Sequence, residues 1–148
     1  MTIEDILHHT EPGDELTVDN EPFSYKSKIV VTLDGGDIVH WLYSEDDNIL
    51  SISPVADEIL FFRFLDEDVE PDEDGVFIGG IAYESSYEDN GVGTEVVGEV
   101  NAEEEDKFQF REYESENGER VRLLTNESNG EVLAYIGKLL ADDDVAKL

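Results

Sequence analysis

The chain lacks cysteine and is poor in basic residues. Its 148 residues include no Cys and only 9 Lys and Arg, against 39 Asp and Glu. The absence of cysteine excludes disulfides, thiolate catalysis and zinc–sulfur sites. The formal net charge of -30 disfavours binding to nucleic acid, because that binding depends on basic side chains that neutralise phosphates.

Long hydrophobic segments are also missing. No stretch approaches the roughly 20 consecutive apolar residues that a membrane-spanning helix needs. The N-terminal residues 1–9 carry no basic region and no apolar run of the kind found in signal peptides. We therefore expect a soluble, cytoplasmic protein without direct insertion into a membrane.

The excess of acid has three competing explanations. Like charges 10 Å apart repel by roughly 0.4 kcal/mol in water, and salt weakens this repulsion by shortening the Debye length from about 8 Å at physiological strength to about 3 Å at 1 M. The acids can be an adaptation to concentrated salt, as in halophilic archaea. They can instead mimic a nucleic acid and occupy a basic groove of another protein, or they can keep the chain disordered.

The composition excludes disorder and favours salt adaptation. Leu, Ile, Val and Phe make up 44 residues, well above the roughly 20% of the chain below which proteins fail to fold. Mimicry requires acids concentrated on one face, whereas residues 1–74 contain 21 acids and residues 75–148 contain 18. Acids also occupy nearly every predicted loop. We expect an acidic protein from a halophilic archaeon, and mimicry is the alternative.

The first half of the chain predicts a short helix and then strands. Thr2 and Asp5 form a capping pair, which predicts a helix over residues 2–8 with Ile3, Ile6 and Leu7 on one face. Alternating apolar residues and β-branched runs predict strands within 16–18, 23–25, 29–33, 38–43, 49–52 and 58–65. The turn at 34–37 predicts a hairpin.

The second half predicts more strands, within 76–83, 94–100, 108–113, 120–125 and 131–136. Their turns are predicted at 90–91, 116–118 and 129–130. In the last two strands one half-buried face is predicted, formed by Val121, Leu123, Val132, Ala134 and Ile136. Residues 142–148 predict a final helical turn, with Asp142 as N-cap and Val145 and Leu148 facing inward.

These elements predict a mainly β fold. We expect a single domain over residues 1–148, with about ten short antiparallel strands in a barrel or a sandwich and a short helix at each end. An organisation in two halves joined by the acidic segment 66–75 is the variant of this prediction, because that segment is the best candidate for a mobile connection.

No motif assigns a catalytic, cofactor-binding or metal-binding residue. The segment 66–75 lacks the Gly and Glu positions of an EF-hand loop, so a solvated loop is expected there. His8, His9 and His40 lack the spacing that metals favour, and Gly79-Gly80 and Gly91-Val92-Gly93 lack the context of phosphate-binding loops. Five aromatic residues either line a recognition groove or pack as half-buried strand residues, and packing is favoured: Trp41, Tyr83, Tyr87, Tyr113 and Tyr135.

Several short motifs occur in a recognisable order. Gly13-Asp14, residues 23–25 and Trp41 come first, and Tyr83 and Tyr87 precede the motifs at 91–93, 97–100, 110–114, 117–118, 123–125 and 131–140. In this order the motifs resemble the family called domain of unknown function 4178, over most of residues 12–140. The acidic segment 66–75 departs from the family pattern. The resemblance implies a β-rich accessory or binding domain in a membrane-stress or envelope system, and it implies no catalytic residues.

We therefore expect a non-enzymatic, salt-adapted interaction module whose partner is a protein. The alternative from another class is an acidic mimic that inhibits a DNA- or RNA-binding protein. A third hypothesis is a hydrolase or transferase whose site consists of residues that no motif marks.

Overall fold

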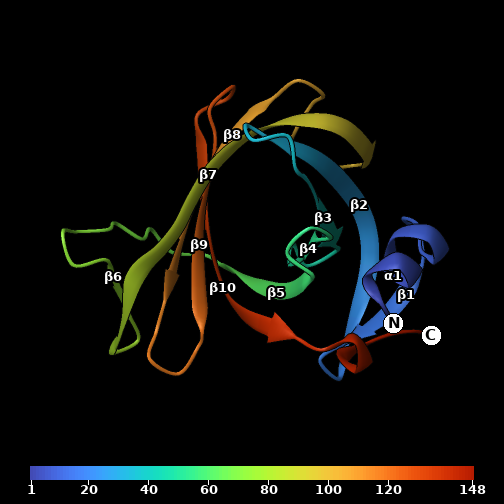
Figure 1. The fold of residues 1–148 in the computed structure, drawn as a ribbon, viewed down its shortest axis with the longest axis horizontal. Coiled ribbons are helices and arrows are strands. Elements are labelled where there is room, and N and C mark those ends of the chain that lie inside the picture. Colours follow the sequence, from blue (N-terminus) through green and yellow to red (C-terminus); the bar gives the residue numbers. More distant parts are fainter.

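The computed structural model describes residues 1–148 and is mainly β, as the sequence predicts. Eight antiparallel strands close a barrel, which Figure 1 shows nearly end-on. These strands are β2 (Glu21–Leu33), β3 (Ile38–Ser44), β4 (Ile49–Ser53), β5 (Glu58–Leu65), β7 (Ile81–Gly98), β8 (Lys107–Glu114), β9 (Arg120–Asn126) and β10 (Glu131–Leu140). Outside the barrel lie α1 (Ile3–His9), β1 (Glu15–Val18), β6 (Val76–Ile78), a 3-10 turn (Asp142–Asp144) and β11 (Val145–Lys147).

The barrel consists of two meanders that close on each other. The first runs β2-β3-β4-β5 and the second runs β7-β8-β9-β10. Closure comes from two antiparallel pairings between the meanders, β2 with β7 and β5 with β10. Strands from both halves of the sequence therefore enclose one interior, and the acidic segment 66–75 connects β5 to β6.

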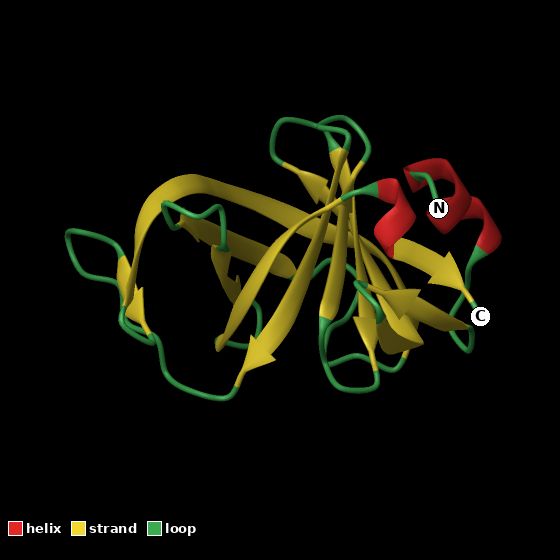
Figure 2. Ribbon diagram, turned by 90° about the horizontal axis from the view of Figure 1, so that it is seen from below, coloured by secondary structure: helices red, strands yellow, loops and turns green.

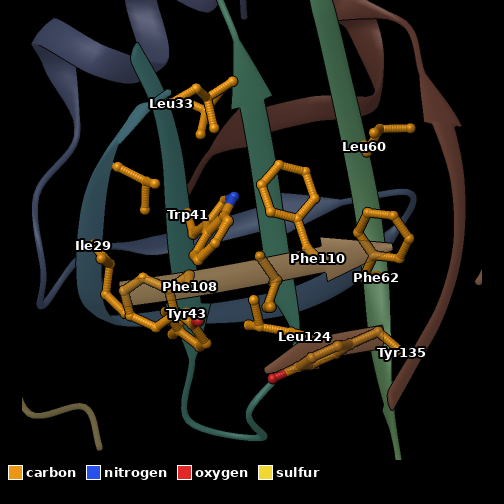
Figure 3. Close-up of a cluster of buried hydrophobic side chains, with 13 residues drawn as sticks. Ile29, Leu33, Trp41, Tyr43, Leu60, Phe62, Phe108, Phe110, Leu124 and Tyr135 are labelled. Carbon is orange, nitrogen blue, oxygen red and sulfur yellow. The ribbon is translucent and has the colours of Figure 1, made fainter. Parts of the chain in front are cut away.

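The interior of the barrel is filled mainly by aromatic and branched side chains from both meanders. Figure 3 shows Trp41 at the centre of this cluster, with Phe108 and Phe110 beside it. Both phenylalanine rings meet the indole edge-on, with centroids 5.3 and 5.6 Å away. An eight-stranded barrel is just wide enough for side chains to fill it or for one small ligand to fit. Empty space is therefore expected only at its two ends.

Two further apolar clusters lie outside the barrel. The first, which includes Ile6, Leu16, Leu50 and Phe61, packs α1, β1 and β11 against the outer face of β3, β4 and β5. Figure 2 shows the two helical segments together, beside both termini. The second cluster joins Val76 and Tyr83, among others, to the outer face of β8, β9 and β10. Because these segments cover parts of the outer surface of the barrel, many barrel strands are buried on both faces.

The N-terminal helix forms as predicted. Asp5 N donates to Thr2 Oγ1 at 3.1 Å and Thr2 N donates to the Asp5 carboxylate at 3.1 Å, which is the reciprocal capping box. Ile6 is buried, and Ile3 and Leu7 pack against the same cluster. The hairpin at 34–37 and the turns at 116–118 and 129–130 also form as predicted.

Two strand boundaries in the second half were predicted wrongly. The strand predicted over 76–83 is interrupted at Gly79 and Gly80, whose φ angles of +57° and +82° turn the chain between β6 and β7. The turn predicted at Asn90-Gly91 does not exist, because both residues lie inside the continuous strand β7. A Cβ on Gly91 would lie 2.6 Å from Val31 Cγ1, so the glycine allows β2 to approach closely.

The C-terminal end also differs from its prediction. Residues 142–144 form only a 3-10 turn, with Ala141 rather than Asp142 as N-cap, and residues 145–147 pair with β1 as a strand. Val145 is buried as predicted, but Leu148 is 77% exposed. Val132, predicted on a buried face, is also exposed at 61%, because it lies beyond the segment that covers the outer cluster.

Candidate functional site

One end of the barrel holds a cavity of about 380 Å³. This volume lies within the range of about 300–1,000 Å³ that is typical of small-molecule sites. Residues of β2, β3, β4, β5, β7, β8 and β9 and of the turns at 34–37 and 54–57 line it. Its wall includes Trp41, Leu60, Phe110, Glu112 and Arg122. We call it the Arg122 cavity.

Arg122 and Glu112 form the floor of this cavity. They lie directly opposite each other on β9 and β8, and both side chains point into the barrel. Arg122 Nη2 donates to Glu112 Oε2 at 3.0 Å. The two side chains are 3% and 6% exposed, so this ion pair is almost completely removed from water.

Aromatic rings surround the Arg122 guanidinium. Its Cζ lies 4.5 Å from the centroid of Phe62, 5.1 Å from that of Phe110 and 5.6 Å from that of Trp41. A cation over an aromatic face is attracted by the ring quadrupole, and the attraction grows when water is excluded. The rings therefore help to hold a positive charge inside an otherwise apolar barrel.

Several donors at this floor have no protein acceptor. No protein group accepts a hydrogen bond from Arg122 Nε, Arg122 Nη1 or Trp41 Nε1. In Figure 3 the indole nitrogen of Trp41 points toward the end of the barrel where Leu33 and Leu60 lie, and both leucines line the Arg122 cavity. Buried donors are normally paired, since an unpaired one costs about 1–3 kcal/mol. These groups are suited to binding an acceptor within the cavity.

A second arginine extends the network toward solvent. Arg120 Nη1 lies 3.8 Å from Glu58 Oε2 and 3.9 Å from Glu112 Oε1, close enough for ion pairing but beyond hydrogen-bond distance. Arg120 and Glu58 are partly exposed, at 20% and 36%. The network thus contains two guanidinium groups and two carboxylates, with Arg122 and Glu112 at the floor and Arg120 and Glu58 nearer the mouth.

The opposite end of the barrel holds a smaller and more apolar cavity of about 200 Å³. Tyr43, Phe108, Leu124 and Tyr135 contribute to its wall, and Figure 3 shows them at the end away from Leu33 and Leu60. Burial raises the pKa of the Tyr43 and Tyr135 phenols well above the usual value, so both stay neutral. No residue that lines this cavity has a buried side-chain donor without a partner.

The aromatic residues predicted as either groove or packing residues separate into two groups. Tyr83 and Tyr113 pack in the outer cluster, and Tyr135 packs inside the barrel. Trp41 and Tyr87 both line the Arg122 cavity, and Tyr87 is 45% exposed at its mouth. Packing is thus the main role of these side chains, but three of them also line a cavity: Trp41 and Tyr87 the Arg122 cavity, and Tyr135 the cavity at the opposite end.

The other motifs do not converge on a site. His8 and His9 lie in the last turn of α1, whereas His40 lies on β3 between Val30 and Ile52. No group of three His, Asp or Glu side chains is placed to hold a metal ion. Gly79-Gly80 forms a turn, and residues 91–93 lie next to a register shift between β2 and β7.

Arg122 and Glu112 were not predicted as site residues. The apolar alternation recognised on β9, Val121 and Leu123, belongs to the outer face of the barrel. The signal lies on the other, inward face of the same strands. On β8, Phe108 and Phe110 are followed at every second position by charged residues, at 112 and 114. On β9, charged residues at 120 and 122 precede Leu124 in the same way. Charged residues that continue the two-residue spacing of aromatic core residues along a strand indicate a buried polar group.

No family model, curated protein or solved structure matches this chain. None of its helices has the length and apolar character required to span a bilayer.

Proposed function

We propose that this chain is a non-enzymatic binding module adapted to concentrated salt, and that the Arg122 cavity is its binding site. The observation that carries the proposal is the pair of buried residues Arg122 and Trp41, which line the cavity and have N–H groups without a protein acceptor. Buried N–H groups are normally paired. A ligand acceptor bound beside them would supply the missing partner.

The composition of the wall supports binding rather than catalysis. Ser51, Ser53 and Ser86 line the cavity, but no histidine does, so the wall contains no serine–histidine pair. Most of the lining residues belong to strands rather than to turns, which favours a preformed site that changes little on binding.

The proposal is tested by screening small polar molecules against the labelled protein in about 1 M KCl. Trp41 is the only tryptophan, so its indole N–H signal in nitrogen-15 NMR spectra reports directly on the cavity floor. We expect ligands to shift this signal while amide signals around Tyr43, at the other end of the barrel, stay in place. A broad library that leaves the Trp41 signal unchanged at millimolar concentration would reject the proposal.

A protein-interaction role is the second candidate, and the β6–β7 hairpin favours it. This hairpin extends to one side of the barrel (Figure 1), and β6 forms one edge of the sheet. Phe77 on this edge is 72% exposed and Ile81 is 40% exposed. Exposed apolar groups on an edge strand are suited to a protein partner, as an accessory domain of a membrane-stress system would require. Affinity purification in molar salt tests this role, since recovery of a partner should depend on Phe77 and fail for Phe77→Ser.

The distribution of acids supports salt adaptation over nucleic-acid mimicry. Of the 39 Asp and Glu residues, only Glu112 is buried. The others are spread over α1, six of the strands (β1, β2, β5, β7, β8 and β10), the turns at both ends of the barrel, the segment 66–75 and the C-terminal turn. Acids therefore surround the molecule instead of forming one stripe at phosphate-like spacing.

A further inference from the structure

We infer that the Arg122 cavity binds a small zwitterion, whose carboxylate accepts from Arg122 and Trp41 and whose ammonium group lies among carboxylates at the mouth. This inference rests on the proposed function and specifies the class of ligand. It follows from the order of charges along the cavity, from its floor to its opening.

The floor provides donors for a carboxylate. Arg122 Nε and Nη1 carry three N–H bonds between them, and Trp41 Nε1 carries one. The planar guanidinium matches the geometry of a carboxylate, and hydrogen bonds between charged groups are about twice as strong as neutral ones. Arg120 makes no hydrogen bond to Glu58 or Glu112, so it can also turn toward a bound carboxylate.

The mouth provides carboxylates for a cation. Asp37 lies exposed in the turn between β2 and β3, and Glu58 and Glu114 lie half-buried at the start of β5 and the end of β8. Apart from Arg120, no basic side chain lines the cavity outside its floor. An ammonium group entering this rim gains attraction from several carboxylates at once.

Ligands with a single charge fit this arrangement poorly. A free anion must approach a protein of net charge -30, and it meets the carboxylates of the mouth before it reaches Arg122. A simple cation is attracted to the mouth but leaves the Arg122 and Trp41 donors without an acceptor. A zwitterion satisfies both ends and carries no net charge.

The apolar residues in the middle of the cavity determine which kind of chain can join the two charged groups of the ligand. Val39 and Leu60 contribute apolar surface between the floor and the mouth. The volume of about 380 Å³ is many times the roughly 30 Å³ that a water molecule occupies. A short aliphatic chain between the two charged groups therefore fits better than a compact ion.

A matched series of probes tests the inference. The full-length protein in about 1 M KCl is titrated with the unbranched ω-amino acids from glycine to 6-aminohexanoate, and with the alkanoates and alkylamines of the same lengths. Binding is followed by calorimetry and by the Trp41 indole signal. We expect at least one ω-amino acid to bind about tenfold more tightly than both of its singly charged analogues, with a clear optimum of chain length.

Other outcomes overturn the inference and leave the proposed function separately testable. An alkanoate as tight as the matching amino acid would show that the mouth carboxylates contribute nothing. An alkylamine as tight would show that the Arg122 donors contribute nothing. If no compound of the series bound, zwitterions of this kind would be excluded. The library screen would still decide whether the cavity binds any ligand.

Two variants at opposite ends of the barrel provide the control. Glu114 forms no ion pair and lies at the mouth, so Glu114→Gln is expected to fold and to weaken binding of the amino acid about threefold to tenfold. It should leave binding of the matching alkanoate unchanged or slightly tighter. Glu127→Gln makes the same change of charge on an exposed residue of the opposite end and should affect neither. Equal effects of both variants would assign the attraction to the net charge of the protein and overturn the inference.

Discussion

Arg122 and Glu112, joined at 3.0 Å inside the barrel, are the only buried base and the only buried acid of the chain. Every other charged side chain keeps contact with solvent. A buried ion pair usually costs as much in desolvation as it gains in attraction. Its place at the floor of a cavity, with three donor atoms left over nearby, is consistent with a role in binding rather than in stability.

Removing one partner of this pair should be costly, whereas removing both should not. Glu112→Leu leaves a buried guanidinium without its carboxylate, and we expect it to lower the free energy of unfolding by about 3–5 kcal/mol. The double variant Glu112→Leu/Arg122→Met should lie within about 1–2 kcal/mol of the original, or above it. Urea unfolding in 2 M KCl measures both.

The exposed ion pair between Lys26 and Asp47 provides the comparison for this experiment. It spans 3.1 Å, but the Asp47 side chain is 63% exposed. Asp47→Asn should therefore change stability by less than about 1 kcal/mol. If Glu112→Leu had a similarly small effect, the buried pair would not be the strongly coupled unit described above.

Stability should depend steeply on salt. Because nearly all of the acids are exposed, their mutual repulsion opposes folding in dilute buffer and is screened in brine. We expect the unfolding midpoint to rise by tens of degrees between about 0.1 M and 2 M KCl. Replacing Asp66, Glu67 and Glu70 by their amides should reduce this rise and stabilise the protein at low salt. A midpoint independent of KCl would contradict salt adaptation.

Closure of the barrel should be sensitive to a methyl group at Gly137. A Cβ there would lie 1.9 Å from the carbonyl oxygen of Phe61, on the strand that pairs with β10. Gly137→Ala must push β5 and β10 apart, and we expect a loss of about 1–3 kcal/mol or more in unfolding free energy. Gly35 has open space and no left-handed backbone angle, so Gly35→Ala should stay within about 0.5 kcal/mol. Equal effects would show that the close approach of the strands is not limiting.

His40 should make the protein less stable as the pH falls below neutrality. Burial lowers its pKa from the model-compound value of 6.5, nearby Lys28 lowers it further, and Glu95 raises it in part. The unfolded chain therefore takes up the proton first, so stability is present above pH 6.5 and is lost as the pH drops toward the lowered pKa. All other titratable groups are shared by the original protein and His40→Gln, so the loss between pH 8 and 5.5 should be smaller for His40→Gln. An identical loss would assign the effect to other groups.

Local signals in the sequence predicted most of the elements. The Thr2–Asp5 capping box, the glycine turn at 34–37 and the apolar strand at 58–65 depend on neighbouring residues only, and each forms as predicted. The errors arise where contacts distant in sequence override a local signal. Asn90-Gly91 is a favourable turn sequence, yet pairing with β2 on one side and β8 on the other keeps it extended.

The sequence by itself determined that the chain has an apolar β interior, acids spread along its whole length and no cysteine chemistry, because composition and alternation are local properties. Only the tertiary structure decided that the strands close as a barrel and that Arg122 and Trp41 face one cavity. The reason is that β2–β7 and β5–β10 pair across the two meanders, and that β9 is buried on both faces. When a strand is buried on both faces, the alternation of its residues does not show which set of side chains points into the barrel. That is known only once the segments that pack on each face are known.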